Sequence, residues 1–307
     1  AAYSQIEHAK ALGMTVVVTD HHEVPFTDTE EGRTYILPPA DAIINPKQAD
    51  CTYPNKNICG AVVAMKLVFA LYEKYRLPEE EKEDFLEPAA IATVGDIMDL
   101  QGENRILVKE GLARLPFTKN KGLKALIRAI GLEDQKITSY DIGFRLGPCI
   151  NASGRLDTAM RSLALLQSED EEEAAKLAGD LKALNDSRKA LTEKGTEEAY
   201  KLIESSDLKN DRVMVVFLPE CHESLAGIIA GRIREKYHKP TFVLTRGEKS
   251  LKGSGRSTEN YSMYEELVKC DSLLVQYGGH PMAAGLSIEE ENVEKFRQTL
   301  NDNCTLT

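Results

Sequence analysis

The sequence predicts an α/β protein in which a long helix joins two sheet-containing domains. Apolar, β-branched runs alternate with helical segments in residues 1–168 and again in residues 209–307, which is typical of sheets covered by helices. Between them, residues 169–208 carry a helical pattern about as long as compact domains contain. We therefore predict a parallel-sheet domain with a helical cap, a connecting stretch of one or two long helices, and a smaller α/β domain.

In the first domain, a helix is predicted over residues 4–13, with Gly13 at its end. The run MTVVVTD (14–20) has no polar alternation, so it predicts a fully buried parallel strand. AIINP (42–46) predicts a second, short strand. Residues 60–132 show helical periodicity throughout, so we expect a helical cap.

In the second domain, strand and helix signals alternate. Strands are predicted at 212–219, 241–245 and 283–288, and helices at 224–237, 262–274 and 290–304. LKGSGRS (251–257) fits either a Gly-rich strand or a turn.

Composition limits the function classes. The 307 residues include 38 Lys+Arg and 49 Asp+Glu, a net charge of −11. A protein that coats nucleic acid by bulk positive charge is thereby excluded, and any bound polyanion needs a local positive groove. No apolar run reaches the roughly 18 residues of a membrane span, and no secretory signal opens the chain. The six cysteines form no CxxC pair, which indicates reduced, structural thiols and a cytoplasmic protein.

Two acidic positions follow apolar segments. Asp20, His21 and His22 come directly after the first predicted strand, and Asp96 ends the apolar run AAIATVG, with Asp99 three residues later. Carboxylates and imidazoles at the carboxyl edge of a sheet suit a divalent metal, and Asp96 and Asp99 would share one helix face. Each motif alone also fits a plain alternative, a helix-capping loop for the triplet and an N-cap for Asp96. Together they predict convergence on one metal pair.

Two further motifs are candidate phosphate sites. INASGRLD (150–157) contains Asn151, Ser153 and Gly154, which allow a tight turn, and Arg155, whose planar guanidinium can hold phosphate. A surface ion pair of Arg155 with Asp157 is the alternative.

GSGRS (253–257) offers the hydroxyls of Ser254 and Ser257 and the charge of Arg256. Residues 245–256 hold four basic and one acidic residue, a local charge of +3. This is the local positive groove that an acidic chain needs in order to bind a polyanion.

Two histidines complete the candidates. His280 follows Gly278 and Gly279, which permit a close backbone approach to a ligand, although a buried structural histidine is the alternative. His222 stands at a predicted helix start, where phosphate is favoured. Its neighbour Cys221 does not indicate zinc or a nucleophile, because no second ligand pair or oriented base accompanies it.

Taken together and in order, these motifs resemble the DHH phosphoesterase superfamily, and within it the single-strand-specific exonucleases. The resemblance covers nearly the whole chain and rests on VVVTDHHEVP, ATVGDIMDL, GENRILVKEGL, RLGPCINASGRLD, CHESLAGIIAGRIREKYHKP, KGSGRS and YGGHPMAAG. It implies a DHH catalytic domain joined by a long helix to a DHH-associated domain that binds nucleic acid. Single-stranded DNA would lie between them and be hydrolysed in the 5′ to 3′ direction, in DNA repair and recombination.

The resemblance also implies roles at a two-metal site for Mn²⁺ or Mg²⁺. His21 would be a metal ligand, Asp96 a ligand that bridges the metals, Asp20 an orienting or assisting group, and His22 a contact to the scissile phosphate. Two metals can activate water and stabilise the leaving oxygen.

The same resemblance implies that Arg155, Ser254 and Arg256 hold phosphates near the 5′ end, and that His280 lines the nucleic-acid groove. A helicase and a single-strand-binding protein are the partners it suggests, while the oligomeric state is left open.

Three expected parts of the family pattern are not in the sequence. The paired-aspartate motif, a further aspartate motif and a later oligonucleotide-binding barrel are not found, and the chain opens at Ala1. We therefore expect a fragment of the catalytic domain that is inactive or nearly so by itself.

Two other functions remain open. One is a phosphodiesterase of short oligonucleotides or cyclic dinucleotides from the same superfamily, and the other is a non-catalytic phosphate-binding module. The exonuclease is favoured over the small-substrate phosphodiesterase by the long connecting helix and by the INASGRLD and GENRILVKEGL segments. It is favoured over the non-catalytic module by the intact Asp20-His21-His22 triplet and Asp96.

Overall fold

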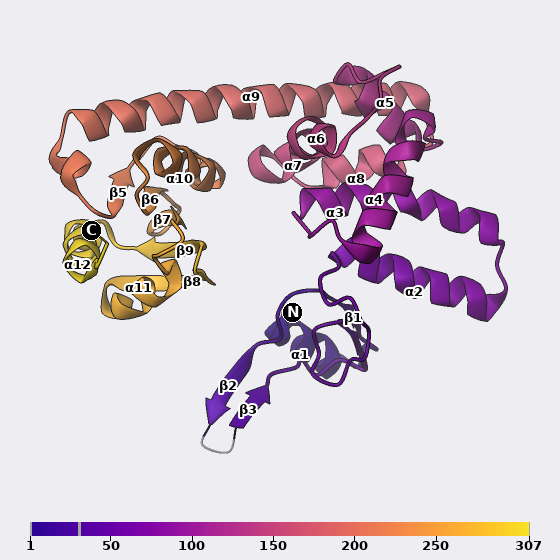
Figure 1. Ribbon diagram of the computed structural model, residues 1–307, viewed down its shortest axis with the longest axis horizontal. Coiled ribbons are helices and arrows are strands. Elements are labelled where there is room, and N and C mark those ends of the chain that lie inside the picture. Colours follow the sequence, from indigo (N-terminus) through magenta and orange to yellow (C-terminus); the bar gives the residue numbers. More distant parts are fainter. Residues whose placement is uncertain (1, 30–31, 307) are drawn as a thin grey trace. The chain divides into compact units, whose positions relative to one another are not determined.

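The structure is a computed structural model, and it describes residues 2–29 and 32–306. The chain forms two compact units (Figure 1). Unit 1 comprises residues 1–151 and 161–182, and unit 2 comprises residues 152–160 and 183–307. The predicted α/β class is confirmed, with a parallel sheet, a long helix and a second sheet domain, while the predicted domain ranges stay a prediction.

Unit 1 begins with helix α1 (Tyr3–Ala11) and a two-stranded parallel sheet of β1 (Val17–Thr19) and β4 (Ala42–Ile44). The chain leaves α1 through Gly13, whose φ of 78° is left-handed, as expected at a helix end. Both predicted strands are present, but the expectation of full burial is wrong. Val17 is 55% exposed, because β4 is the one strand that flanks β1 within the described residues.

A hairpin that the sequence analysis did not foresee connects these strands. Strands β2 (Phe26–Thr29) and β3 (Gly32–Tyr35) pair antiparallel. The ring of Phe26 lies edge-on to Tyr35, and the Arg33 guanidinium lies 3.6 Å from the Phe26 ring centroid. The hairpin therefore gains aromatic and cation–π contacts.

The helices predicted over residues 60–132 are confirmed as α2 to α5, and further helical elements follow up to residue 167. Within 60–132 the elements are α2 (Gly60–Tyr75), η1 (Glu79–Phe85), α3 (Leu86–Gly95), α4 (Gly102–Arg114), η2 (Leu115–Phe117) and α5 (Lys121–Ala129). After them come α6 (Ser139–Asp141), the π-helical turn η3 (Ile142–Leu146), α7 (Gly147–Leu156) and α8 (Met160–Gln167). One core cluster joins α2, α3 and α4 through Val62, Val63, Ala89 and Leu107.

The segment 150–157 corrects the prediction of a tight turn. It continues α7 to Leu156. The side chains of Ala152 and Ser153 have no exposed surface, so burial of this small helical face outweighs the turn preference of Asn, Ser and Gly residues.

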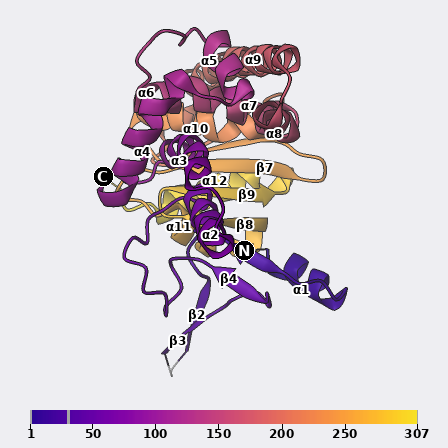
Figure 2. The same cartoon turned by 90° about the vertical axis from the view of Figure 1, so that its right-hand side faces the viewer.

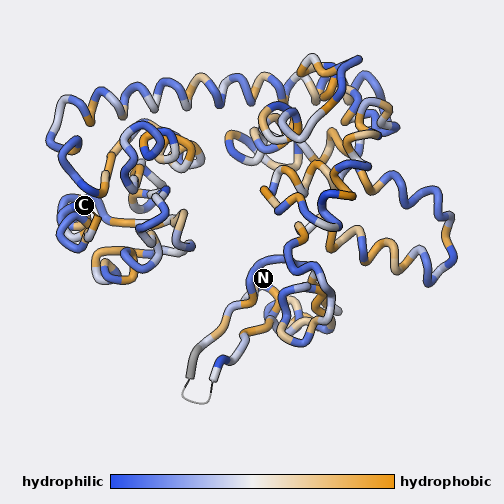
Figure 3. The backbone as a smooth tube through the Cα atoms, viewed as in Figure 1, coloured by the Kyte–Doolittle hydropathy of each residue, from blue (hydrophilic) through white to orange (hydrophobic). Residues whose placement is uncertain are grey.

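The long predicted helix is present as α9 (Glu171–Glu204), which is one helix of 34 residues. Its hydrophilic surface is interrupted at intervals by hydrophobic residues (Figure 3). Buried positions recur at intervals of three, four or seven residues, which is the periodicity of a packed helix face. They are Ala174, Ala178, Leu181, Asn185, Thr192, Thr196, Ala199 and Ile203.

Unit 2 contains a five-stranded sheet in the order β5-β6-β7-β9-β8. The strands are β5 (Met214–Phe217), β6 (Thr241–Arg246), β7 (Leu251–Arg256), β8 (Leu274–His280) and β9 (Ala283–Ile288); the helical elements are η4 (Asp207–Asn210), α10 (Glu223–Tyr237), α11 (Met263–Lys269), η5 (Asp271–Leu273), η6 (Glu290–Asn292) and α12 (Val293–Asn303). β5 and β6 are parallel and the other pairs are antiparallel. LKGSGRS is therefore a strand, and β8 is a strand that the sequence analysis did not identify.

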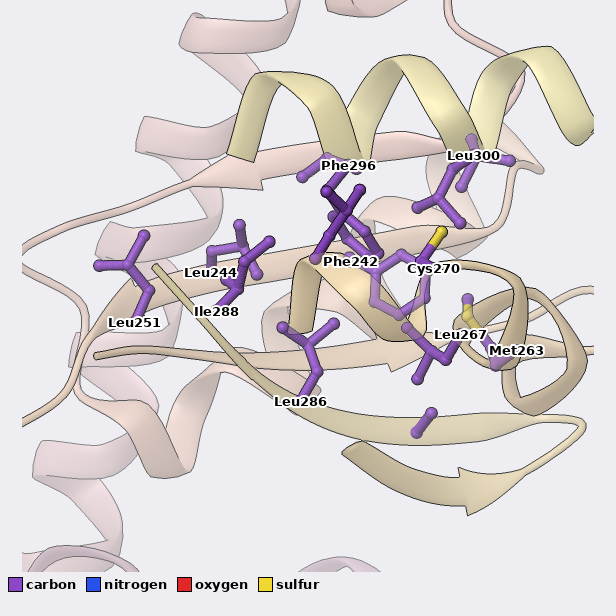
Figure 4. Packing of buried hydrophobic residues seen from close by; sticks show 14 of the residues in the cluster. Phe242, Leu244, Leu251, Met263, Leu267, Cys270, Leu286, Ile288, Phe296 and Leu300 are labelled. Atoms are coloured by element: carbon purple, nitrogen blue, oxygen red, sulfur yellow. The ribbon is translucent and has the colours of Figure 1, made fainter. Parts of the chain in front are cut away.

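Alternate residues of β6 face opposite sides of this sheet. Phe242 and Leu244 belong to the core under α11 and α12, where Phe242 lies edge-on to Phe296 (Figure 4). Val243 belongs to a second core, which α10 covers with Leu225 and Ile229 (Figures 1 and 2). Helices on both faces explain why Thr241–Thr245 of β6 is buried on both sides of the sheet. No helix within the described residues is long and apolar enough to cross a membrane.

Candidate functional site

Asp20 organises the loop that follows β1. Its backbone N–H donates to the carbonyl of Ile44 at 3.0 Å, which extends the pairing with β4 by one residue. Its Oδ1 accepts hydrogen bonds from the N–H groups of His21 (2.7 Å) and His22 (3.1 Å) and from His22 Nδ1 (2.6 Å). Burial raises the pKa of Asp20, but these hydrogen bonds outweigh burial and hold the pKa well below its ordinary value. Asp20 is therefore a charged group that fixes the positions of both histidines.

The structure brings His21 and Asp96 together. Asp96 caps the C-terminal end of α3, and its Oδ2 lies 3.5 Å from His21 Nε2. The His21 side chain is 17% exposed and that of Asp96 is 45% exposed, so the pair lies at the surface of unit 1. An imidazole nitrogen and a carboxylate oxygen at this distance can act together on one ligand.

The neighbouring Asp99 does not join them as predicted. Helix α3 ends at Gly95, and Ile97 has a left-handed φ of 56°, so the chain turns away before Asp99. The Asp99 carbonyl accepts from Asn104 Nδ2 at 3.0 Å. The expectation that Asp96 and Asp99 share a helix face is therefore wrong, because no helix spans them.

Two residues that support the histidines were missed in the sequence. Asn45 is 6% exposed, and its side-chain amide donates to the His22 carbonyl at 3.0 Å. It follows β4 as Asp20 follows β1, and a polar residue directly after the second strand was the available signal. Gly60, at the start of α2, gives His21 room, since a Cβ there would lie 3.3 Å from His21 Cδ2.

The chemistry of His21 and Asp96 fits part of a divalent-metal site. Imidazole nitrogen and carboxylate oxygen are both ligands of Mn²⁺, and the fit for Mg²⁺ rests on the carboxylate. Within residues 2–29 and 32–306, however, no group of three or more His, Cys, Asp or Glu side chains could hold a metal ion. The described chain therefore supplies part of a ligand set.

The second candidate region is a group of arginines in unit 2, which we call the arginine cluster (Arg155, Arg234 and Arg256). Arg256, at the end of β7, is partly buried and donates to Ser254 Oγ at 3.2 Å and to the Gly255 carbonyl at 2.7 Å. Burial lowers the pKa of Arg256, and the charges of Arg155 and Arg234 lower it further. Three guanidinium groups that repel one another form a local site for anions.

Helix α10 holds this cluster in place. Arg155 Nη1 donates to the Ser224 carbonyl at 3.0 Å, in the first turn of α10. Arg256 and Ser254 lie directly against Gly227, where a Cβ would come within 2.7 Å of Arg256 Nη2 and 2.8 Å of Ser254 Oγ. The absence of a side chain at Gly227 is thus what allows this position of the guanidinium.

The pleat of β7 separates the residues of the GSGRS motif. Ser254 and Arg256 face α10, whereas Gly255 packs against Phe242 and Ser257 is fully buried. The Ser257 hydroxyl donates to the Tyr261 carbonyl. Because side chains alternate along a strand, Ser257 is a core hydroxyl, contrary to the prediction that it contacts phosphate.

The remaining predicted residues have different surroundings. His222 is the N-cap of α10, and its Nδ1 accepts from the Ser224 N–H at 3.3 Å and lies 2.8 Å from Ser224 Oγ. His280 is exposed at the end of β8, so the buried alternative does not apply. Asn151 is exposed on α7 and belongs to unit 1.

A groove in unit 2 includes Ser224, the residue whose carbonyl Arg155 contacts. Its volume is about 510 Å³, and Ser224, Lys252, Gln276, Tyr277, Gly278 and Ser287 contribute to its lining. Lys252 Nζ donates to Ser287 Oγ at 2.9 Å. The groove thus contains one cation, Lys252, and one acid, Glu223, beside uncharged polar side chains.

Comparison with known proteins identifies both regions. The family model described as "DHH family, N-terminal domain" matches residues 1–93, which contain the Asp20-His21-His22 triplet, and the model described as "DHHA1 domain" matches residues 210–305. The fold and the site thus define a DHH-type protein with a DHH-associated domain.

Curated relatives of this chain include exonucleases named RecJ. The chain is 36% identical over 323 residues to the single-stranded-DNA-specific exonuclease RecJ of Escherichia coli, with 99% of the chain and 54% of that protein aligned. It is 38% identical over 304 residues to the RecJ of Bacillus subtilis, with 98% of the chain and 37% of that protein aligned. The chain spans about half the length of the curated relatives it matches, or less.

Solved structures agree. A manganese-bound exonuclease RecJ shares 34% identity at a TM-score of 0.78, and the chain covers 72% of it. The Mn²⁺ complex of Thermus thermophilus RecJ gives a TM-score of 0.82 at 34% identity, with 98% of this chain and 43% of that chain covered. The chain belongs to the RecJ family.

Proposed function

We propose that the protein to which this chain belongs is a metal-dependent exonuclease that hydrolyses single-stranded DNA from its 5′ end, in DNA repair and recombination. The observation that carries the proposal is the approach of His21 Nε2 to Asp96 Oδ2 at 3.5 Å, at the end of a strand, with Asp20 holding the loop. The relatives named as single-stranded-DNA-specific exonucleases support it.

His21 and Asp96 would hold Mn²⁺ or Mg²⁺, as the Mn²⁺- and Mg²⁺-bound structural relatives suggest. The metals would supply an activated water and charge stabilisation on the leaving oxygen. Asp20 orients the ligand loop and contacts His22 Nδ1. The His22 side chain is 73% exposed, so its other ring nitrogen, Nε2, would contact the scissile phosphate.

The arginine cluster would position the DNA. Guanidinium groups bind phosphate oxygens without reading bases, which suits a nuclease with little sequence preference. Arg155 and Arg256, with Ser254, would hold phosphates near the 5′ end, and exposed His280 would line the path of the strand.

By itself, the 307-residue chain would hydrolyse DNA slowly or not at all, because its described residues supply two metal ligands rather than a full set. It would still bind single-stranded DNA through unit 2. A helicase and a single-strand-binding protein are the partners that we propose for the whole protein.

The test compares a long single strand with a dinucleotide, both with Mn²⁺, for the whole protein and for the 307-residue chain. We expect the whole protein to degrade the long strand faster and to lose this activity in Asp96→Asn. Asp99→Asn is the matched control, because that carboxylate is exposed and forms no metal-ligand group with His21 and Asp96 among the described residues. Faster cleavage of the dinucleotide would favour a small-substrate phosphodiesterase, and full activity of Asp96→Asn would refute the metal role.

A further inference from the structure

The turn that carries Asp96 contains a strained and exposed isoleucine. Among the described residues, four that are not glycine have a positive φ, namely Arg76, Ile97, Asp134 and His238. Ile97, with a φ of 56°, is the β-branched one. A β-branched side chain in this region is a genuine outlier, because its Cβ lies too close to the backbone. Strain of this kind concentrates at functional sites.

The turn itself does not require this side chain. The N–H of Ile97 donates to the Val94 carbonyl and that of Met98 to the Thr93 carbonyl, both at 3.1 Å, which is the pattern of a Schellman motif. In that motif Ile97 occupies the position that glycine usually takes. Glycine would therefore end α3 with the same hydrogen bonds and without the strain.

Packing within the described chain does not account for the side chain either. Ile97 is 89% exposed, the largest exposed fraction of any large hydrophobic residue in ranges 2–29 and 32–306. A single exposed hydrophobic residue is ordinary, but this one also carries backbone strain. A side chain that lowers stability and is not buried by its own chain points to a binding partner that covers it.

Ile97 adjoins the two candidate metal ligands. Its Cα follows that of Asp96 at about 3.8 Å, and Asp96 Oδ2 lies 3.5 Å from His21 Nε2. A phosphodiester held at this pair brings its sugar and base to the same part of the surface. The Ile97 side chain has no polar atom and cannot bind phosphate, but it complements the apolar faces of a sugar or a base.

We propose that Ile97 packs against the nucleotide that is joined to the scissile phosphate and thereby positions it, an inference that rests on the proposed function. Asp96 would act on the charged part of the substrate, and Ile97 on its apolar part. The strained turn keeps an apolar side chain in solvent beside the carboxylate until the DNA covers it.

The test measures kcat and KM of the whole protein on single-stranded oligothymidylate with Mn²⁺. Ile97→Gly should raise KM about threefold to tenfold and change kcat less, because it removes a contact that binds the substrate before reaction. Ile97→Asn should raise KM as much, since asparagine tolerates the left-handed region but is polar. Ile97→Val keeps an apolar, β-branched side chain, so it should restore KM to within about twofold of the wild type.

Urea unfolding of the 307-residue chain measures the strain separately. Ile97→Gly should raise the folding equilibrium constant about threefold, because relief of the strain outweighs the greater freedom of glycine in the unfolded chain. The exposed side chain loses no buried surface in this substitution. A variant that is more stable but binds DNA more weakly separates a role in binding from a role in folding.

Arg76→Gly is the matched control. Arg76 has a φ of 54° and ends α2 in the same Schellman motif, so glycine there relieves strain in the same way. The 16 residues of α2 separate Arg76 from Gly60, which lies beside His21. We therefore expect Arg76→Gly to stabilise the chain and to leave KM unchanged.

Three results would overturn the inference, and they separate it from the proposed function. If Ile97→Gly and the wild type had equal KM while Asp96→Asn was inactive, the proposed function would stand and the role of Ile97 would fail. If Ile97→Gly destabilised the whole protein, the side chain would pack against protein rather than DNA. Wild-type activity of Asp96→Asn would refute the proposed function, and with it the DNA contact beside Asp96.

Discussion

Replacing Gly227 by Ala tests how α10 positions the arginine cluster. A Cβ at residue 227 would lie 2.7 Å from Arg256 Nη2 and 2.8 Å from Ser254 Oγ, whereas ordinary contact begins at 3.4 Å. The guanidinium must therefore move by 3.4 − 2.7 = 0.7 Å. A shift of this size exceeds the roughly 0.5 Å within which a binding constellation works.

The expected effect is a loss of DNA affinity without a loss of fold. A charge-assisted hydrogen bond contributes about 1.5–3 kcal/mol, so losing one at the cluster weakens single-stranded DNA binding by about tenfold to a hundredfold. Fluorescence anisotropy with a 5′-phosphorylated oligothymidylate measures this change. The atoms that the new methyl group meets are side-chain ends rather than backbone, so unit 2 should remain folded.

Gly231→Ala is the matched control on the same helix. A Cβ at residue 231 meets no atom within 4 Å, so DNA binding should not change, and helix propensity should raise the free energy of unfolding by about 0.5–1 kcal/mol. If Gly227→Ala and Gly231→Ala bound DNA with equal affinity, the reasoning that places phosphates at Arg256 would be refuted.

Three further predictions concern the other groups described above. Gly60→Ala places a Cβ 3.3 Å from His21 Cδ2, so Mn²⁺ affinity, measured by calorimetry on the whole protein, should fall; unchanged affinity would contradict the role of His21. Asp20→Asn should lower the free energy of unfolding by about 1–3 kcal/mol near neutral pH. Because the native pKa of Asp20 is depressed, this contribution is present above pH 3.8 and is lost as the pH falls below that value. Urea unfolding of the wild type and Asp20→Asn measures it, and a difference in unfolding free energy that does not change with pH would contradict the prediction. Burial raises the pKa of Cys270 to about 11, so this thiol should react with a disulfide reagent at pH 8 after unfolding and not before.

Much of the site was predictable because it depends on local sequence. Asp20, His21 and His22 follow a β-branched run, and the end of a strand is where side chains reach the open edge of a sheet. The position of His222 at a helix start was also predicted, whereas the use of its own ring to cap α10 was not. The turn at residues 150–157 was predicted wrongly, because local turn preference was weighed without the burial of Ala152 and Ser153.

By itself, the amino-acid sequence determined the alternation of strands and helices, the long α9, and the motif order that resembles a family, because these depend on local periodicity and residue type. The tertiary structure alone decided that His21 meets Asp96, that Arg155 and Arg234 lie near Arg256, and that Ser254 and Arg256 face α10 while Ser257 is buried. His21 and Asp96, like Arg155 and Arg256, come from segments far apart in the chain. The packing of helices against sheets, rather than any preference of the residues themselves, sets the distances between them and decides which side of β7 is buried.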